Sequence, residues 1–201
     1  MDVQNWEKKR QYSPDQIDLA RHVLAEIRKG MGVKEAVRKN PLPEGGYISK
    51  HLLVSVYRDL VEKGEQSIDH QLLARIRLKP VRTLSGVTTV TVLTKPYPCP
   101  GECIFCPTDV RMPKSYLPDE PGAMRAVQHN FEPYSQVSAR IAALEAVGHP
   151  TDKIELLILG GTWSAYRRDY QEWFVKRCLD ALNQSDSPDL EGAQVYNETA
   201  K

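Results

Sequence analysis

Long apolar runs are absent from this sequence, and none follows the basic residues Lys8, Lys9 and Arg10. We therefore expect neither a signal peptide nor a membrane-spanning helix, and no membrane partner. Histidine is scarce, and the five present show no metal-ligand spacing. Cysteine is scarce as well: of four, three are clustered and Cys178 lies far downstream. Three clustered thiols in a chain without secretion signals do not indicate disulfides, so we expect a reducing, cytoplasmic location.

The overall composition is that of an ordinary globular protein. In 201 residues, 41% are hydrophobic and 26% are charged, which predicts one or two domains and no general disorder. The net charge is +1, but residues 1–83 hold 16 Lys and Arg against 11 Asp and Glu, whereas the remainder holds 11 against 15. The basic first part is a modest signal for a polyanionic partner, and a solvated helical surface is the alternative.

Three cysteines, Cys99, Cys103 and Cys106, have the spacing C-x3-C-x2-C on a predicted loop after a strand. Thiolates at this density can hold a metal, and iron–sulfur clusters are normally held by cysteine. Four irons on three thiolates leave one iron open to a substrate or cofactor, as in catalytic metal sites. Structural zinc is the alternative, but it usually takes four ligands in two pairs.

Helices are predicted throughout the first third of the chain. Ser13-Pro14 caps a helix that ends at Gly30, and a short helix covers about 33–39. A third helix follows Gly46, and a fourth starts near Ser67 and runs to Arg82. The last of these carries the cations that we take as candidates for binding RNA phosphates: Arg75, Arg77, Lys79 and Arg82. Their alternative is a solvated linker surface.

A βαβ unit is predicted downstream. Val87–Thr94 is rich in β-branched residues, a helix covers about 135–147, and 154–159 reads as a buried strand. The two strands should be parallel neighbours. Residues 107–135 contain five prolines, too many for a long helix, and form a candidate lid or binding surface. Further helices are expected at about 170–183 and from Ser187-Pro188 to Lys201.

The cysteine loop and Gly160-Gly161 both follow the carboxyl ends of their predicted strands. Ligands bind at that edge of parallel sheets, so the two loops should face one pocket. Paired glycines allow a small polar ligand to approach the backbone closely. The aromatic residues Trp163, Tyr166, Trp173 and Phe174 are interpreted as packing, with Trp163 alone placed to line the pocket, and Cys178 as a buried core thiol.

C-x3-C-x2-C resembles the cluster motif of the radical S-adenosylmethionine (radical SAM) enzymes, and longer stretches carry a more specific resemblance. They are Arg82 to Val87, Lys95 to Cys99, Ser115 to Ala126, Gly148-His149 with Asp152-Lys153, and Leu159 to Thr162. Together these resemble the catalytic subunit of Elongator over about residues 75–201, and more loosely before that. Members of that family modify tRNA at C5 of the wobble uridine. The resemblance implies a transferase that uses acetyl-coenzyme A and a 5′-deoxyadenosyl radical to install a carboxymethyl group.

Carried onto this chain, the resemblance assigns Cys99, Cys103 and Cys106 to a 4Fe-4S cluster. It places S-adenosylmethionine on the open iron, near Gly160, Gly161 and Thr162, with Phe105 beside the adenine. The N-terminal helices and their cations would hold the tRNA through its shape and backbone. Acetyl-coenzyme A would bind an acetyltransferase domain. No residue is assigned a direct catalytic role.

The implied fold is α/β, with helical residues 1–80 for tRNA binding and 81–201 as the first βα units of a partial radical SAM (β/α) barrel. No third strand is predicted after Gly160-Gly161, and two parallel strands cannot close a barrel. We therefore expect a fragment that lacks the rest of the barrel and the acetyltransferase domain and is inactive alone. Its partners would be tRNA and the remainder of the enzyme; the oligomeric state is open, and a homodimer is one option.

Two other functions fit the same residues. A tRNA-binding scaffold with a structural cluster would bind RNA without cleaving the cofactor. A radical enzyme with another substrate would cleave the cofactor regardless of tRNA, and its basic N-terminal surface would only be solvated.

Overall fold

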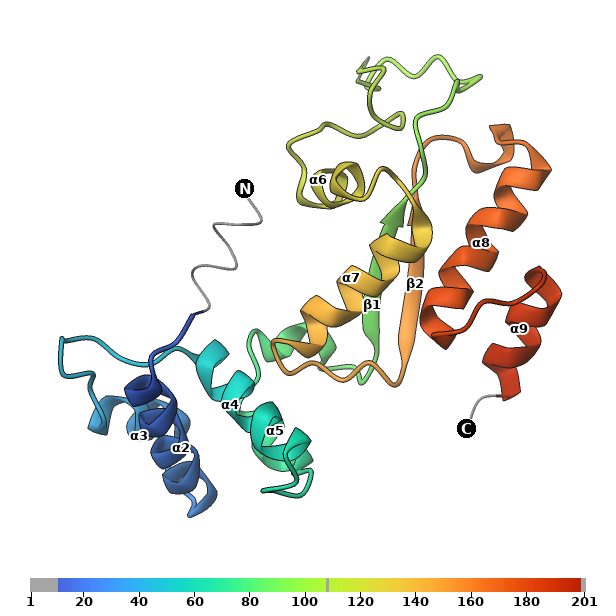
Figure 1. Cartoon of the computed structure of the whole chain (residues 1–201). Coiled ribbons are helices and arrows are strands. Elements are labelled where there is room, and N and C mark those ends of the chain that lie inside the picture. The colour runs from blue at the N-terminus through green and yellow to red at the C-terminus, as the bar shows by residue number, and fades with distance from the viewer. Residues whose placement is uncertain (1–10, 108, 200–201) are drawn as a thin grey trace. The chain divides into compact units, whose positions relative to one another are not determined.

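The computed structural model describes residues 11–107 and 109–199, and they divide into two units (Figure 1). The first unit contains the described part of Met1–Ser85 together with Leu144–Pro150, and the second contains Gly86–Ala143 and the described part of Thr151–Lys201. The basic residues Lys8, Lys9 and Arg10, and Lys201 at the other end, lie outside the described residues. No helix in the described part of the chain is both long and apolar enough to cross a membrane.

In its described residues the first unit contains the helices α2 (Pro14–Arg28), α3 (Val33–Lys39), α4 (Lys50–Glu62) and α5 (His70–Ile76). Ser13 and Gln16 form a reciprocal capping box at the start of α2. Ser49 and Asp69 cap α4 and α5 by accepting hydrogen bonds from backbone N–H groups. The apolar stripes predicted from the sequence form one buried core, in which Ile27, Leu53 and Ile76 are fully buried.

The prediction that the fourth helix continues to Arg82 is wrong. Helix α5 ends at Ile76, Lys79 has a left-handed backbone with φ of 47°, and a short 3-10 helix, η1, covers Pro80–Thr83. Pro80 explains the break, because proline lacks an N–H and disfavours the α conformation of the residue before it. The basic stretch is therefore a bent connection and not a helical face.

Residues 144–150 belong to the first unit, although the sequence placed them in the second region. The Leu78 N–H donates to the Val147 carbonyl at 3.0 Å, and Thr83 Oγ1 lies 3.0 Å from His149 Nδ1. Gly148 has a φ of +87°, and a Cβ there would come within 3.1 Å of the Arg77 Cβ. Glycine is therefore required at this close approach of two backbones. Contacts with residues far away in the sequence therefore place residues 144–150 in the first unit.

Two parallel strands, β1 (Thr88–Leu93) and β2 (Ile154–Leu159), form the sheet of the second unit, in the register Thr88 to Ile154 through Leu93 to Leu159. This confirms the predicted βαβ unit. Its crossover contains α7 (Pro133–Glu145), close to the predicted helix, and α6 (Pro121–Gln128), which the sequence did not predict among its prolines. Pro121 stands in the first turn of α6, where its missing N–H costs nothing.

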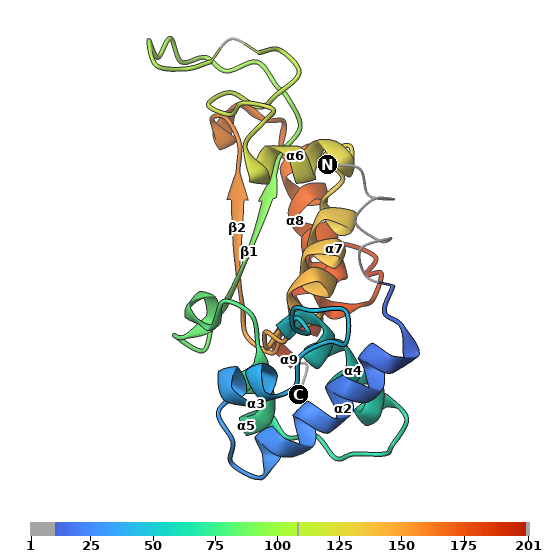
Figure 2. The ribbon, with the colours of Figure 1, turned by 90° about the vertical axis from the view of Figure 1, so that its left-hand side faces the viewer.

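Helices α7 and α8 (Arg168–Asn183) lie on the same side of the two strands (Figure 2). Successive side chains of a strand point to opposite faces of the sheet. Val90 and Val92 share one face and are fully buried, whereas Leu157 points to the other face and is 40% exposed. At Leu93, the backbone groups of β1 are satisfied by the side-chain amide of Gln136 in α7. The Leu93 N–H donates to Gln136 Oε1 at 2.9 Å, and Gln136 Nε2 donates to the Leu93 carbonyl at 3.0 Å.

A 3-10 helix, η2 (Trp163–Ala165), follows β2, and α9 (Leu190–Thr199) ends the described chain. The described residues contain these two strands alone. The structure therefore shows an α/β unit with a parallel strand pair and does not show a barrel.

Candidate functional site at the carboxyl ends of the strands

The cysteine loop after β1 and the glycine loop after β2 meet at one edge of the sheet. Cys99 Sγ lies 3.1 Å from Thr162 Oγ1, although the two residues are 63 positions apart. The parallel pairing of β1 and β2 produces this contact, because the carboxyl ends of parallel strands lie at the same edge. The expectation that the two loops converge is confirmed for Cys99 and Thr162.

Cys99 is held in surroundings that favour its thiolate. The hydrogen bond with the Thr162 hydroxyl, followed by that from the Gly101 backbone N–H at 3.4 Å, lowers the pKa of the Cys99 thiol. Both donors stabilise negative charge on sulfur, and the thiolate is the form that binds metals. The surroundings of Cys99 therefore favour the thiolate over the thiol.

The other two cysteines of the loop remain accessible. Cys103 is exposed, and Cys106, partly exposed, has its Sγ 3.9 Å from Ser115 Oγ. All four cysteines of the chain are free thiols. Cys178 is fully buried in α8, and this burial raises its pKa to about 12, as expected for an inert core thiol.

The donors of the loop are three free thiols, which is the chemistry that iron–sulfur clusters use and that zinc sites can also use. A Cβ at Gly101 would lie 3.5 Å from the Cys99 Sγ and 3.7 Å from the Cys103 Sγ, so both thiols lie beside this glycine. Within the described residues, no three His, Cys, Asp or Glu side chains are grouped closely enough to hold a metal ion.

Gly160 has a structural reason to be glycine. A Cβ at this position would overlap Thr94 Oγ1, which lies 2.8 Å from the Tyr166 hydroxyl. The space that the sequence interpretation reserved for a ligand is therefore occupied here by Thr94. At Gly161 a Cβ would lie 3.4 Å from the Lys114 Cβ, an ordinary contact. Both glycines and Trp163 line a cavity of about 330 Å³ whose lining includes no cysteine.

Phe105, predicted to lie beside an adenine, is 91% exposed, and its neighbour Ile104 is 89% exposed. Apolar side chains this exposed in a loop are unusual unless something else covers them. The protein itself does not enclose Phe105, so the ring is free to contact a ligand.

The four predicted RNA-binding cations fall into two pairs. Arg75 donates to the carbonyls of Ile27 and Met31 at 2.8 and 2.6 Å, and so satisfies the carboxyl end of α2. The half-buried Arg77 donates to Thr83 Oγ1 at 3.1 Å. Lys79 and Arg82 are exposed on the bent connection after α5. These last two are the better placed for a phosphate backbone.

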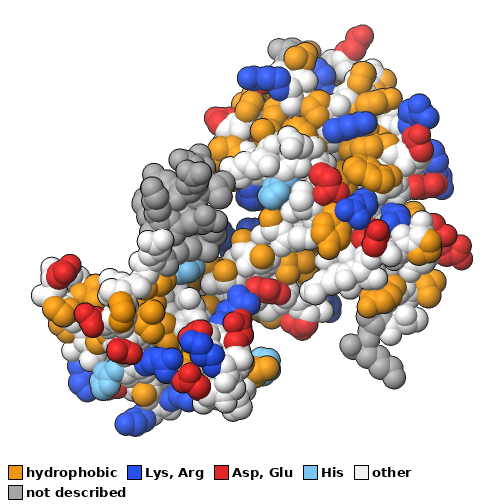
Figure 3. Space-filling view, viewed as in Figure 1, with side chains coloured by type: hydrophobic (Ala, Val, Ile, Leu, Met, Phe, Trp, Pro, Cys, Tyr) orange, Lys and Arg blue, Asp and Glu red, His pale blue; other side chains and the backbone are white. Residues whose placement is uncertain are grey.

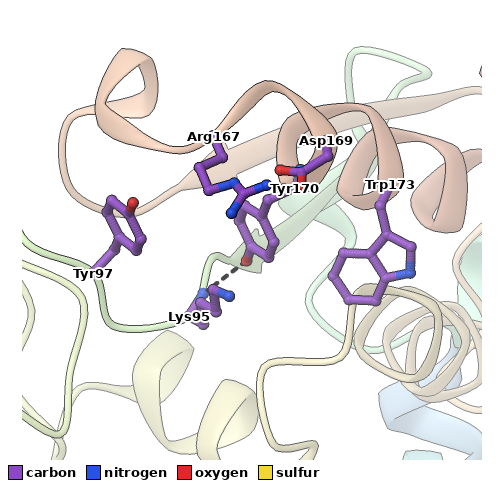
Figure 4. Close-up of a pocket in the computed structure, with 6 residues that line it drawn as sticks. All are labelled: Lys95, Tyr97, Arg167, Asp169, Tyr170 and Trp173. Atoms are coloured by element: carbon purple, nitrogen blue, oxygen red, sulfur yellow. Dashed lines mark hydrogen bonds and ion pairs between the residues drawn. The ribbon is translucent and has the colours of Figure 1, made fainter.

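A second cavity, of about 360 Å³, was not anticipated from the sequence (Figure 4). Its lining consists of cationic, acidic and aromatic side chains from the loop after β1 and from the start of α8: Lys95, Tyr97, Arg167, Asp169, Tyr170 and Trp173. Sequence interpretation had assigned Trp173 to packing. The available signal was the aromatic spacing of Tyr166, Tyr170 and Trp173, which puts three rings on adjacent turns of one segment.

The fold and the site define an α/β protein with a cysteine loop at the carboxyl edge of two parallel strands. No family model matches the chain. Among known proteins it is 55% identical over 136 residues to the tRNA uridine(34) acetyltransferase of Methanocaldococcus infernus, covering 65% of this chain and 26% of the relative. The corresponding enzyme of Dehalococcoides mccartyi is 49% identical over 120 residues, covering 60% of this chain and 26% of that protein.

The Drosophila melanogaster protein named Elongator complex protein 3 is 31% identical over 192 residues, covering 89% of this chain and 35% of its own length. A solved structure of the archaeal Methanocaldococcus infernus Elp3 matches with a TM-score of 0.42 and 44% identity, covering 57% of this chain and 20% of that one. The chain is thus a homologue of the tRNA uridine(34) acetyltransferases and of Elongator protein 3, which confirms the resemblance found in the sequence. It spans about a quarter of the length of the first two relatives.

Proposed function

We propose that this chain forms the tRNA-binding and cluster-binding part of an enzyme that modifies C5 of the wobble uridine of tRNA. The names of its homologues support the substrate and the reaction class. The observation that carries the proposal is the contact between Cys99 and Thr162, because it joins the cysteine motif to the glycine loop at one edge of the sheet. A purely structural metal site would not need that second loop.

Cys99, Cys103 and Cys106 would hold a 4Fe-4S cluster, with S-adenosylmethionine on the side of Gly161 and Thr162. When bound, cluster and cofactor would together supply one-electron chemistry that protein side chains cannot. The chain itself contributes the position of the ligands: Thr162 and Gly101 contact the Cys99 sulfur and favour its thiolate form. A reducing, cytoplasmic location would keep the three thiols available.

The tRNA would contact the first unit through its exposed cations. Lys79 and Arg82 are free of the backbone contacts that hold Arg75, so they would serve phosphate oxygens. Residues 1–80, with Arg82 just beyond them, would then hold the tRNA backbone, and 81–201 would hold the cluster and cofactor as the first part of a (β/α) barrel. Acetyl-coenzyme A would bind to a part of the relatives' length that this chain does not span.

The experiment is anaerobic reconstitution of the full chain with iron and sulfide, followed by iron counting and electron paramagnetic resonance with and without S-adenosylmethionine. We expect about four irons per chain and a spectrum that the cofactor perturbs. Cys103→Ala should lose the cluster, whereas Cys178→Ala, which removes a buried thiol away from the loop, should keep it. Bound zinc, or a cluster that ignores the cofactor, would favour a structural site instead.

A further inference from the structure

The cavity between the loop after β1 and the start of α8 is separate from the residues assigned to the cluster. None of its six lining residues is a cysteine or belongs to Gly160–Thr162. Its volume of about 360 Å³ falls at the lower end of the range for small-ligand sites. Figure 4 shows Arg167 and Lys95 on either side of Tyr170, with the indole of Trp173 beside it.

The aromatic wall of this cavity consists of rings that already contact one another. Tyr97, Tyr166 and Tyr170 form a continuous stack with ring centroids 4.8 and 5.0 Å apart. The Tyr170 hydroxyl accepts from the Lys95 backbone N–H at 3.0 Å, and this bond joins the loop to the helix. Trp173 lies 5.6 Å from Tyr170 and keeps 41% of its surface exposed. It is therefore the ring in this wall with a substantial open surface.

Two cations are held beside that wall. The Lys95 Nζ lies 4.5 Å from the centroid of the Tyr170 ring, and Asp169 binds the Arg167 guanidinium at 2.8 Å. With Asp169 included, the lining carries a net charge of +1 from Lys95 and Arg167. The planar guanidinium is suited to phosphate. On this lobe of the molecule, Lys and Arg side chains lie among hydrophobic ones (Figure 3).

We propose that this cavity binds one nucleotide of a single-stranded RNA segment, with the base stacked on Trp173 and its phosphate bound by Arg167 and Lys95. The inference rests on the proposed function, which makes tRNA the substrate. A simple anion would not use the aromatic wall, and a neutral aromatic ligand would not use the cations. Single-stranded RNA is commonly recognised by stacking its unpaired bases on aromatic side chains and binding its backbone with cations.

The test is the affinity of the full chain for a fluorescein-labelled, eight-nucleotide single-stranded RNA, measured by fluorescence anisotropy at low salt. Arg167→Ala should weaken binding about three- to tenfold and reduce the slope of log affinity against log salt by about 0.7, the value for one phosphate contact. Arg168→Ala is the matched control, because Arg168 is equally charged, 86% exposed and paired with Glu172 at the same helix end, but does not line the cavity. It should change affinity less than twofold.

Variants of Trp173 test the base. Trp173→Leu should weaken binding at least fivefold, since loss of one stacked base has effects of this order. Trp173→Phe should restore part of the affinity, because it keeps an aromatic face. Thermal unfolding of both Trp173 variants checks that the chain is folded. If a Trp173 variant does not fold, the comparison of Arg167→Ala with Arg168→Ala still tests the proposal.

The outcomes separate this inference from the function on which it rests. Equal affinities for Arg167→Ala and Arg168→Ala, with RNA binding otherwise intact, would overturn the cavity as an RNA site and leave the proposed function standing. Failure of the wild-type chain to bind RNA would overturn both. Uridine monophosphate serves as a competitor: if it displaces the labelled RNA at a concentration equal to that of unlabelled oligonucleotide, the cavity is a mononucleotide site and the RNA assignment fails.

Discussion

The two units of this chain differ in where their apolar side chains are buried and where they are exposed. In the first unit, the apolar stripes of α2, α3, α4 and α5 pack on one another, and Val23, Ile27, Leu53 and Ile76 are fully buried. In the second unit, helices cover one side of the strand pair, while Leu157 of β2 is 40% exposed and Ile104 and Phe105 of the cysteine loop are about 90% exposed. Exposed apolar groups of this kind mark surfaces where a ligand or further protein binds. The first unit also exposes apolar side chains, since Val81 and Leu84 are about 80% exposed. The difference between the units is one of position, because the exposed groups of the second unit lie on the cysteine loop and on the open face of β2.

The largest expected effect is the difference in unfolding free energy between the same substitution, Leu→Ala, made in each of the two units. Leu53→Ala, at a fully buried position of the first unit, should lower the free energy of unfolding by about 2–5 kcal/mol. Leu157→Ala, on the open face of β2, should cost less than about 1 kcal/mol because its side chain already meets solvent. Urea denaturation followed by circular dichroism measures both. Equal losses would mean that Leu157 is covered in solution.

The second prediction concerns the close approach that brings the glycine loop against β1. Gly160→Ala should destabilise the second unit by about 1–3 kcal/mol, because the new Cβ overlaps Thr94 Oγ1. Gly161→Ala is the control, since its Cβ would make an ordinary contact with Lys114. Tryptophan fluorescence during denaturation follows this unit through Trp163 and Trp173, with Trp6 as the third emitter of the chain. Adding Thr94→Ala to Gly160→Ala should recover part of the loss, and a Gly161→Ala variant as unstable as Gly160→Ala would contradict the steric explanation.

The third prediction divides the basic residues of the first unit by role. Arg75→Ala removes two hydrogen bonds to carbonyls at the end of α2 and should cost about 1–2 kcal/mol of stability. Arg82→Ala, at an exposed position, should change stability by less than about 0.5 kcal/mol but weaken binding of tRNA. Denaturation and tRNA affinity are measured on both variants. Loss of tRNA affinity only with Arg75→Ala would reverse the assignment.

The fourth prediction is a pH dependence of the second unit, which is seen only in alkaline solution. Burial raises the pKa of Cys178 from 9.0 to about 12, so between these values the folded chain keeps a proton that the unfolded chain loses. The stabilisation is therefore fully present below pH 9 and declines as pH rises towards about 12. Unfolding followed by tryptophan fluorescence should show this decline in wild type and a shallower one in Cys178→Ala. Identical slopes would show that the thiol is not buried in solution.

Local residue patterns predicted most of the elements. The Ser13-Pro14 cap, the apolar stripe of α4 and the β-branched run of β1 each placed an element within a few residues of its observed bounds. Parallel pairing followed from the βαβ order, and with it the approach of Cys99 to Thr162. Each of these depends on spacing or on chain order, both of which are visible in the sequence.

Tertiary contacts decided the remainder. Nothing local shows that Arg75 would bind carbonyls of α2, that Gly160 would make room for Thr94, or that Gly148 would lie against Arg77. The aromatic cavity likewise depends on Tyr97 and Tyr170, which are far apart in sequence and meet through Tyr166. The sequence by itself determined the elements, the cysteine motif and the edge of the sheet where the motif lies. Only the folded chain decided which cations and rings are free for a ligand, because side-chain availability depends on neighbours that chain order does not reveal.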